Sequence, residues 1–481
     1  MDVSSFSSDV DVVVAGCGPT GAVLAAELRL HGVRVLVVDP QTGPKSIVRI
    51  VGLHVRSVEL MAMRGLLDRL LEHGRRRPAA GFFAGIPGPV PEGLDTAHPF
   101  LLGLPQPVLE RILEEHAVAL GAQVRRGVAV SGFVQDADGV TVELDDGARV
   151  RARFLVGCDG GRSTVRKLAG VAFEGEPSRS ETLMGEMEVG VPPEEVAALV
   201  AAAGPVAGSF WVRPFGDVYS VVVPAGGVGG RGVPPVLEDF RARLRVVAGT
   251  DFGVRSPRWL SRFGDATLLA GSYRAGRVLL AGDAAHVHPP LGGQGLNLGV
   301  QDAVNLGWKL AGQVRGWAPE GLLDSYGAER RPVAAAVLEN TRAQAALSSP
   351  GAGPEALRRL VGELMRFGEV NRFLVERIAG LEVRYDFGEG PEVVGCRQRD
   401  LEVAGGSLYG LMSGGRGLVV DRSGGLGVGG WSDRVDLVAD PGVGLNDSAV
   451  LLRPDGYVAW AGSGQAGLES ALARWFGGPV G

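Results

Sequence analysis

Residues 11–39 of the chain read DVVVAGCGPTGAVLAAELRLHGVRVLVVD. The run DVVVA is short, β-branched and continuously apolar, which is typical of a strand buried in a parallel sheet. The chain then passes Gly16, Gly18 and Gly21, a helical pattern, and a second apolar strand that ends at Asp39. This order predicts a complete βαβ unit of the dinucleotide-binding type.

The three glycines of this unit indicate what it binds. They permit a tight turn and let the backbone approach a pyrophosphate at the positive end of the helix. The carboxylate at the end of the second strand is placed to accept a hydrogen bond from an adenosine ribose hydroxyl. The same glycine spacing recurs at Gly227-Gly229-Gly232, Gly425-Gly427-Gly430 and Gly462-Gly464-Gly467. The first two lack a following helix pattern and the third lacks a second strand, so we expect only the N-terminal pattern to bind a dinucleotide.

Length and composition set the class of protein. At 481 residues the chain is too long for one compact core, so we expect two or three domains. A net charge of −6 argues against a nucleic-acid-binding surface. The three cysteines are scattered and form no disulfide framework, and no apolar run approaches the roughly 18–20 residues that cross a bilayer. The N-terminus has no signal-peptide pattern, so we expect a cytoplasmic protein without a membrane partner.

Two further stretches place short polar turns between a strand and a helix. Residues 151–170, RARFLVGCDGGRSTVRKLAG, predict a strand, then Asp159-Gly160, then a helix capped near Ser163. Taken alone, an Asp-Gly pair is usually an ordinary turn. Residues 281–299, AGDAAHVHPPLGGQGLNLG, follow a strand and lead into a helix expected from about Leu296 to Leu310.

The second of these stretches also raises the alternative of a metal site. Asp283, His286 and His288 form a set of two histidines and a carboxylate, the ligands of many non-haem iron oxygenases. No other motif in the chain supports a metal. We therefore expect the histidines to pack the loop or to form hydrogen bonds, and we predict no metal.

Together, in this order and spacing, the three motifs resemble those of the para-hydroxybenzoate hydroxylase family of group A flavin monooxygenases. Within this family the chain is similar to aromatic polyketide hydroxylases of antibiotic pathways, particularly the angucycline group. The resemblance covers essentially the whole chain. It implies an α/β fold with a Rossmann-like FAD-binding domain, an inserted antiparallel-sheet substrate domain and a thioredoxin-like C-terminal domain.

The patterns along the chain give provisional domain boundaries. Strands with turns between them and one short helix, PPEEVAALVAAAG, fill the middle of the chain, and amphipathic helices follow. From about residue 393 the chain returns to strands and glycine turns, with Cys396 but no CxxC motif, so a structural role or dimer contacts are expected there. The expected parts are 1–175 (FAD-binding, first part), 176–272 (substrate sheet), 273–392 (FAD-binding, second part, with helices) and 393–481 (C-terminal domain).

The resemblance assigns the FAD contacts residue by residue. Asp283 would bind a ribityl hydroxyl, because an ionised carboxylate only accepts hydrogen bonds. The following loop would lie along the isoalloxazine ring, and its helix would aim a positive N-terminus at the pyrimidine edge. The loop residues are Pro289, Gly292, Gly293, Gln294, Gly295, Leu296 and Asn297.

Other residues are assigned by the same resemblance. Arg49 and Arg56 would lie near the FAD phosphates, and Gln106 would hold the flavin chain. Asp159 and Gly160 would serve FAD and the passing nicotinamide nucleotide. The family more often has glutamate at the position of Asp39, so the geometry of the ribose contact is left open.

The resemblance implies an FAD-dependent monooxygenase. FAD would be tightly bound, NADPH or NADH would reduce it transiently, and a flavin hydroperoxide would hydroxylate a polycyclic aromatic polyketide with molecular oxygen. Aromatic and proline side chains are candidates for the substrate pocket, although each aromatic is equally typical of an ordinary core: Phe82, Phe83, Trp211, Phe215 and Pro290. No side chain is identified as a catalytic acid or base.

Alternatives to hydroxylation stay open on the sequence. A Baeyer–Villiger oxygenase acting on a related polyketide ketone would use the same cofactor and motifs. A flavoprotein that only sequesters an unstable intermediate would also retain them. A halogenase is disfavoured because the GWxWxIP motif is absent and GWAPEG at 316–321 does not match it.

Overall fold

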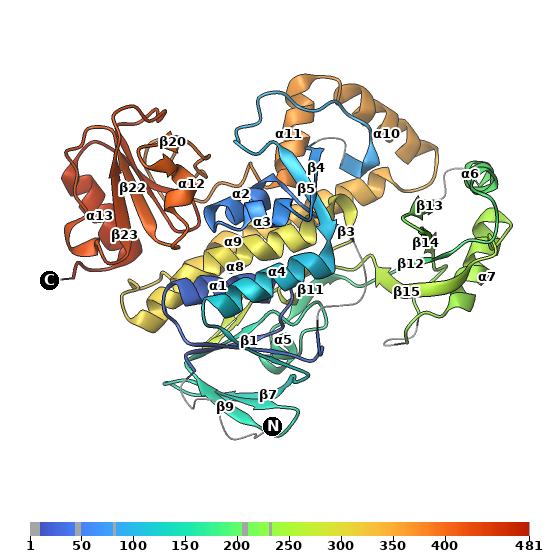
Figure 1. Ribbon diagram of the computed structural model, residues 1–481, viewed down its shortest axis with the longest axis horizontal. Coiled ribbons are helices and arrows are strands. Elements are labelled where there is room, and N and C mark those ends of the chain that lie inside the picture. The colour runs from blue at the N-terminus through green and yellow to red at the C-terminus, as the bar shows by residue number, and fades with distance from the viewer. Residues whose placement is uncertain (1–9, 44–49, 80–82, 204–209, 230–232, 481) are drawn as a thin grey trace.

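The computed structural model describes residues 10–43, 50–79, 83–203, 210–229 and 233–480. Figure 1 shows a central α/β body with a helix-covered sheet at one end and the C-terminal α/β unit at the other. None of the described helices combines the length and the apolar character needed to cross a membrane.

A six-stranded sheet forms the core of the central body. Its strand order is β17-β18-β10-β1-β2-β6, and β1 pairs in parallel with both β2 and β10. All four residues of β1 are buried, as a continuous apolar run in a parallel sheet requires. The strands are β1 Val12–Ala15, β2 Val35–Asp39, β6 Gln123–Arg126, β10 Phe154–Gly157, β17 Arg274–Ala275 and β18 Val278–Leu280. The predicted N-terminal βαβ unit is therefore confirmed.

Two long helices, α1 and α8, pack against each other over this sheet. Helix α1 spans Pro19–Leu30 and α8 spans Gln294–Arg315, so α8 is longer at both ends than the helix expected from Leu296 to Leu310. The helices approach closely at Gly307, where an added Cβ would lie 2.3 Å from the Cβ of Glu27. α8 is buried along most of its length, which explains why apolar periodicity alone underestimated it.

Smaller sheets and helices surround this core. Three-stranded sheets have the orders β3-β5-β4, β7-β8-β9 and β11-β16-β19. Their strands are β3 Ile50–Leu53, β4 Arg75–Pro78, β5 Phe100–Pro105, β7 Val130–Gln135, β8 Val140–Leu144, β9 Arg149–Ala152, β11 Phe173–Glu176, β16 Thr267–Ala270 and β19 His286–Val287. The accompanying helices are α2 Val55–Met63, α3 Leu67–Leu71, α4 Gln106–Ala119 and α5 Thr164–Leu168, with short 3-10 turns at Phe83–Gly85, Gly282–Ala284 and Leu291–Gly293.

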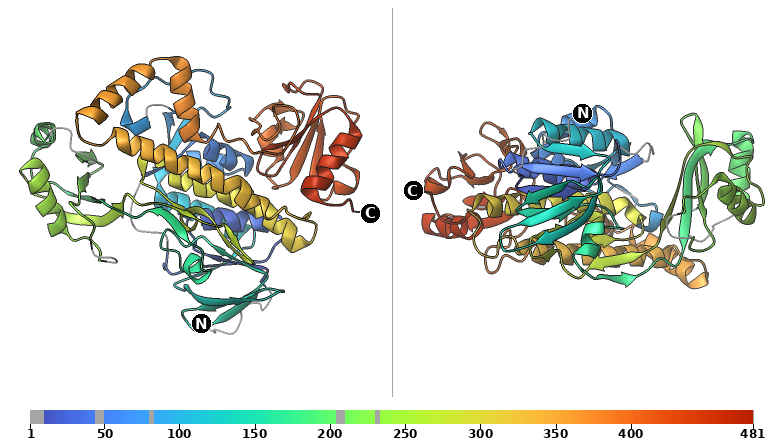
Figure 2. Two further views of the ribbon diagram at one scale, coloured as in Figure 1. Left: turned by 180° about the vertical axis from the view of Figure 1, so that it is seen from behind. Right: turned by 90° about the horizontal axis from the view of Figure 1, so that it is seen from below.

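The middle of the chain forms a four-stranded antiparallel sheet with the order β13-β14-β12-β15. Two helices cover one of its faces, and Figures 1 and 2 show them on the side away from the central body. The elements are β12 Glu181–Glu188, α6 Pro193–Ala202, β13 Trp211–Phe215, β14 Val218–Pro224, α7 Leu237–Ala248 and β15 Arg255–Gly264. The opposite face of the sheet, which carries no helix, looks toward the central body.

Helix α7 corrects the expectation of a single helix in this region. It buries only Phe240 and Leu244, four residues apart, and carries several arginines, so its apolar stripe is narrow. The sequence pattern predicted no helix after Gly227-Gly229-Gly232, and α7 shows that this prediction was wrong. Residues 230–232 themselves lie outside the described residues. The strands on either side, β14 and β15, both pair antiparallel with β12, so this pattern forms no dinucleotide-binding unit.

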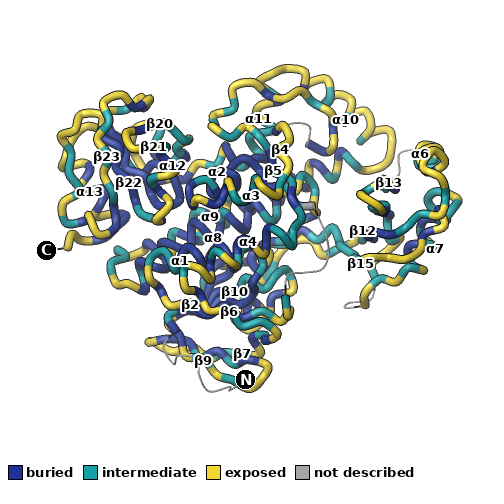
Figure 3. The backbone as a smooth tube through the Cα atoms, in the orientation of Figure 1, coloured by how far each residue is buried: buried dark blue, intermediate teal, exposed yellow. Residues whose placement is uncertain are grey.

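The remaining chain forms three helices and then the C-terminal unit. The helices are α9 Ser325–Leu347, α10 Ala352–Leu364 and α11 Gly368–Ala379. The C-terminal sheet has the order β23-β22-β24-β25, with one parallel pair followed by two antiparallel pairs. Its elements are β20 Glu402–Val403, β21 Gly406–Ser407, α12 Leu408–Leu411, β22 Gly417–Asp421, a 3-10 turn Gly429–Trp431, β23 Val435–Ala439, β24 Ala449–Leu452, β25 Val458–Gly462 and α13 Gln465–Phe476. Figure 3 shows buried backbone in this sheet as well as in the central body, and the buried apolar side chains of the two form one continuous core. The middle sheet and its two helices have a separate core.

Candidate functional site

The turn between β1 and α1 accepts only glycine at two of its three glycine positions. Gly16 has φ +102°, and a Cβ there would lie 2.3 Å from the carbonyl oxygen of Cys158. A Cβ at Gly21 would lie 1.9 Å from the carbonyl oxygen of Gly16. Gly18 differs, because nothing in the described part of the chain lies within 4 Å of its Cβ position. Open space at the N-terminus of a helix is where a phosphate group can approach the backbone amides.

Asp39 ties the end of β2 to this turn. Its Oδ2 accepts a hydrogen bond of 2.6 Å from the Cys17 amide, and its Oδ1 accepts one of 2.8 Å from the Gln41 amide. Arg126 lies 3.7 Å away. Each carboxylate oxygen can accept a second hydrogen bond, so the ribose contact stays compatible with this arrangement.

The Asp-Gly motif after β10 lies against the same turn. Asp159 Oδ2 accepts hydrogen bonds from the amides of Thr164 (2.7 Å) and Val165 (3.0 Å) at the start of α5. The hydroxyl of Ser163 accepts from the Arg166 amide at 2.9 Å, which confirms the predicted helix cap. The other oxygen, Asp159 Oδ1, is buried and has no hydrogen-bond partner among the described residues. A buried acceptor in this state suits a hydroxyl donor supplied by a ligand.

The third motif packs against Thr20, at the start of α1 and next to the same glycine turn. Gly282 has φ +62°, and a Cβ there would lie 2.6 Å from Thr20 Oγ1. A Cβ at Gly299 in α8 would lie 2.3 Å from the same atom. The neighbouring Asp283 is exposed and makes no ion pair or hydrogen bond recorded in the described structure. The three motifs, distant in sequence, therefore converge around the N-terminus of α1. The amide donors of this N-terminus suit the pyrophosphate of an FAD, and the carboxylate acceptors suit its hydroxyl groups.

A buried carboxylate fixes the turn that carries Asp283. Asp302 Oδ2 accepts a hydrogen bond of 3.1 Å from the Gly282 amide and lies 2.7 Å from His286 Nε2. Arg330 Nε donates to Asp302 Oδ1 at 2.7 Å. Burial raises the pKa of Asp302, but the charge of Arg330 and the contact with His286 outweigh it, so that this pKa is lowered.

The same contacts bear on the metal alternative. The ring of His286 is held by Asp302, and His288 Nδ1 lies 2.8 Å from the carbonyl oxygen of Pro289. Across the described ranges there is no group of three or more histidine, cysteine, aspartate or glutamate residues that could hold a metal ion. Both histidine side chains therefore make hydrogen-bond contacts that hold the conformation of the loop.

The glycine loop before α8 is anchored by Asn297. Its Nδ2 donates to the carbonyl oxygens of Gly52 and Gly293, both at 2.9 Å, and its Oδ1 accepts from the His54 amide at 2.7 Å. Gly292 (φ +71°) and Gly293 have left-handed backbones that favour glycine. The rest of the predicted loop is mixed in exposure: Pro289 and Gln294 are buried, Gly295 and Leu296 are half-buried, and Pro290 is exposed.

Several predicted residues lie elsewhere or outside the described residues. Arg56 is fully buried, pairs with Glu59 at 2.8 Å and donates to the carbonyl oxygen of Asp455 at 2.6 Å. It therefore joins α2 to the C-terminal unit, against the expectation of an arginine free to reach a phosphate. Gln106, at the start of α4, donates to Glu110 Oε1 at 2.7 Å. Arg49 and Phe82 lie outside the described residues.

The structure separates the aromatic residues predicted for the substrate pocket. Trp211 and Phe215 lie on β13 and alternate with Val212, which packs against the helix-covered face, so they belong to the opposite face. Phe83 lies in a separate apolar cluster with Leu347 and Met365. It is an ordinary core residue there, one of the two roles that the sequence left open.

Sequence reasoning missed other residues on the helix-free face. Arg213 places its guanidinium 4.3 Å from the centre of the Trp211 ring. Met184 lies in register with Val222 and hence with Trp211, and Glu186 is next on this face. Burial raises the pKa of Glu186. Period-2 alternation along β12 and β13 would have found this set once the buried face had been identified.

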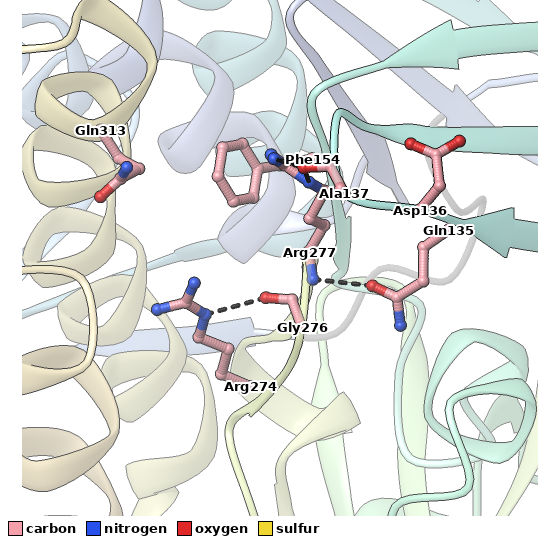
Figure 4. Close-up of a pocket in the computed structure, with 8 residues that line it drawn as sticks. All are labelled: Gln135, Asp136, Ala137, Phe154, Arg274, Gly276, Arg277 and Gln313. Atoms are coloured by element: carbon pink, nitrogen blue, oxygen red, sulfur yellow. Dashed lines mark hydrogen bonds between the residues drawn. The ribbon is translucent and has the colours of Figure 1, made fainter.

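A separate cavity of about 420 Å³ lies at the edge of the central sheet, near β17. Figure 4 shows that it is lined by side chains such as Arg274 and Arg277, and none of the predicted site residues contributes to it. Arg274 Nε donates to the Gly276 carbonyl at 2.8 Å, and the Arg277 amide donates to Gln135 at 2.8 Å. These groups serve local structure, and the cavity is not part of the candidate site.

Comparisons with known proteins agree with this geometry. The family model described as "FAD binding domain" matches residues 9–341, and "Aromatic-ring hydroxylase, C-terminal" matches residues 392–479. A rifampicin monooxygenase from Streptomyces venezuelae is 59% identical over 97% of this chain and 98% of its own length. Another from Rhodococcus hoagii is 57% identical with the same coverage. The solved structure of the anhydrotetracycline hydroxylase OxyS from Streptomyces rimosus superposes with a TM-score of 0.88 at 42% identity, covering 98% of this chain and 99% of that one.

Proposed function

Because the chain belongs to the family of FAD-dependent aromatic-ring monooxygenases, we propose that it inserts one oxygen atom into the fused aromatic ring system of a rifampicin-type antibiotic. FAD is its cofactor, NAD(P)H its reductant and molecular oxygen its co-substrate. The observation that carries the substrate class is the identity of 59% and 57% to two rifampicin monooxygenases over nearly the full length of all three chains. The anhydrotetracycline hydroxylase is 42% identical.

An angucycline-type phenol is the second substrate class. It is supported by the structure of CabE, an aromatic hydroxylase from angucycline biosynthesis, which covers 98% of this chain with a TM-score of 0.86 at 39% identity. The lower identity ranks this class behind the rifampicin type. Both classes present an electron-rich aromatic ring, so the reaction proposed is the same.

The residues that would hold FAD are those that converge at the N-terminus of α1. We assign the pyrophosphate to the open space beside Gly18, the ribose to Asp39, and polyol hydroxyls to Asp159 and Asp283. Bound FAD supplies the activation of molecular oxygen. The glycine loop anchored by Asn297 would then let a flat ring approach the backbone without an intervening side chain.

The helix-free face of the middle sheet is the surface proposed for the substrate. It looks toward the central body and offers the ring of Trp211, the side chains of Phe215 and Met184, and the cation of Arg213. Apolar and aromatic surfaces suit a polycyclic ring, and they also exclude water from the reacting atoms. Orientation of the substrate and exclusion of water are the tasks that this chain contributes.

The C-terminal unit has a structural role in this proposal. Its strand order, a parallel pair followed by an antiparallel hairpin and a helix, supports the thioredoxin-like assignment. Cys396 is the one cysteine of the unit, so redox chemistry by a cysteine pair is not proposed. Dimer contacts through this unit stay a prediction.

The test is product analysis with FAD-loaded protein, NADPH, rifampicin and ¹⁸O₂. One ¹⁸O in a product with an intact carbon skeleton is expected. One ¹⁸O in a hydrolysable lactone would identify a Baeyer–Villiger oxygenase and overturn hydroxylation. No incorporation from rifampicin, anhydrotetracycline or an angucycline phenol, despite tight binding of one of them, would support a sequestering flavoprotein instead.

A further inference from the structure

Helix α10, at the outer edge of the molecule, exposes an apolar stripe (Figure 3). Leu357, Leu360 and Leu364 follow the spacing of one helix face and are 49%, 51% and 41% exposed. Phe367, just after the helix, is 65% exposed. Fifteen large apolar side chains are exposed in the described part of the chain, and these four lie within eleven residues. Such a concentration of exposed apolar side chains marks an interaction surface.

A neighbouring side of α10 packs on the central body. Val361 and Met365 belong to the same apolar cluster as Phe83. The guanidinium of Arg358 donates to the carbonyl oxygen of Ala84 at 2.7 Å. The helix is therefore held from one side, and none of its residues is fully buried. The leucine stripe is left uncovered.

Charges of both signs flank the stripe. Arg359 and Glu363 lie one helical turn apart on the same flank, and both are exposed. Neither has an ion pair recorded in the described structure, and an arginine that precedes a glutamate by four residues is in the less favourable order for pairing within one helix. The whole helix carries two arginines and two glutamates, so it offers no net positive charge to an anionic membrane surface. This pattern favours a protein partner that also carries both signs.

We propose that α10 pairs with α10 of a second copy of this chain, antiparallel about a twofold axis between residues 360 and 361. Leu357 and Leu364 are equally far from this point along the helix, so each faces the other residue of the partner subunit. An antiparallel pair brings the same flank of both helices together, which places Arg359 beside Glu363 of the partner subunit. A twofold interface must be self-complementary, and the apolar and the charged residues of α10 both meet this condition.

The contact is small, which sets the expected affinity. A helix of 13 residues is about 20 Å long at 1.5 Å per residue. Four large apolar side chains on each copy bury less than the roughly 1,200–2,000 Å² of a stable interface. We therefore expect a reversible dimer with a Kd on the order of micromolar.

The test is sedimentation velocity of the FAD-loaded protein from about 1 to 200 µM, a range that spans this Kd. Leu360→Glu puts an unpaired charge at the centre of the contact and should raise the dimer Kd at least about tenfold. Val246→Glu, at an exposed valine of α7, is the control and should match the wild type. Arg359→Glu and Glu363→Arg should each weaken the dimer because like charges then meet, and the double variant should restore it. Thermal unfolding and FAD content show that each variant is folded.

Cysteine cross-linking tests the direction of the pair. Leu360→Cys should form an intermolecular disulfide on oxidation, because both copies of this residue lie beside the axis. Leu357→Cys should not, because antiparallel pairing separates its two copies by about 10 Å along the helices. The wild type, with its three cysteines, gives the background. Equal cross-linking of both variants would exclude the antiparallel arrangement.

Three other results would overturn the proposal. A wild type that stays monomeric over the whole concentration range would show that the stripe binds no second copy. A dimer that persists in Leu360→Glu would place the contact on another surface, such as the C-terminal unit. A double charge variant as weak as the single variants would show that Arg359 and Glu363 do not meet across the axis.

Discussion

At the scale of single residues, the three glycines of the β1–α1 turn have different roles. Gly16 and Gly21 are required by the fold, since a Cβ at either would overlap a backbone carbonyl. Gly18 is not required by the fold, since its Cβ position is open and its φ of −75° suits any residue, and we therefore attribute this glycine to the ligand. The sequence pattern shows three equivalent glycines, and only the structure separates the two that the fold requires from the one that it does not.

This difference predicts opposite results for two alanine variants. Gly18→Ala should retain the wild-type thermal stability but weaken FAD binding at least about tenfold, because its methyl group enters the space assigned to the pyrophosphate. Gly21→Ala should lower the free energy of unfolding by about 1–3 kcal/mol, because overpacking forces the backbone apart. Calorimetry of the apoprotein and FAD fluorescence titration measure the two effects. Equal FAD affinity in Gly18→Ala and wild type would contradict the assignment.

Asp283 gives a second residue-scale prediction. Hydrogen bonds to a charged group contribute about 1.5–3 kcal/mol, so Asp283→Ala should raise the Kd for FAD by roughly 10- to 150-fold. The apoprotein should unfold at the wild-type temperature, because the carboxylate is exposed and has no recorded partner in the described structure. Asp138→Ala, at another exposed aspartate, is the control. An unchanged Kd for FAD would contradict the assignment of Asp283 to the FAD site.

At the scale of elements, strands and helices with a strong local pattern could be predicted from the sequence. Which face of an element packs against which distant element could not. The strand DVVVA and the cap at Ser163 are both local signals, and both are confirmed. Helix α7 and the role of Arg56 depend on partners far away in sequence, namely the sheet β12–β15 and Asp455. Phe83 and Trp211 are both aromatic in sequence, but only the packing of their elements separates a core residue from an open sheet face.

The open face of the middle sheet yields the element-scale prediction. Trp211→Ala should raise the KM for rifampicin about tenfold or more, because the aromatic ring that stacks with Arg213 is lost. FAD affinity should not change, since β13 contributes none of the converging acceptors. Phe83→Leu, in the separate apolar cluster, should alter stability rather than KM. Steady-state kinetics at saturating NADPH measure the effect. An unchanged KM would contradict the proposal that the substrate binds to this face.

At the scale of the whole molecule, buried ion pairs join the C-terminal unit to the central body. Arg453 pairs with Glu329 of α9 at 2.7 Å and with Asp455, and it lies beside the rings of Phe387 and Trp475. Removing one partner of a buried pair leaves an uncompensated charge. Arg453→Ala should therefore lower the free energy of unfolding by about 3–5 kcal/mol. Arg149→Ala, which breaks the exposed pair with Glu143, should cost no more than about 1 kcal/mol in the same denaturant titration.

The same cluster makes the stability of the whole molecule depend on pH. Burial lowers the pKa of Lys309 to about 8, and the attraction of Glu329 at 2.9 Å only partly opposes it. Between pH 8 and the ordinary lysine pKa of 10.5, the unfolded chain binds more protons at this site than the folded one, so this residue makes stability rise with pH. The contribution should reach about 2.5 kcal/mol by pH 10.

Buried tyrosine and cysteine side chains titrate in the same range with the opposite sign, because burial raises the pKa of groups such as Tyr385 and Cys158. The measurement is therefore the difference in unfolding free energy between wild type and Lys309→Met, followed by urea titration from pH 7 to 10. That difference should shift in favour of the wild type as the pH rises above 8. A difference that stays constant with pH would mean that Lys309 keeps its proton throughout this range, and that Glu329 compensates its burial in full.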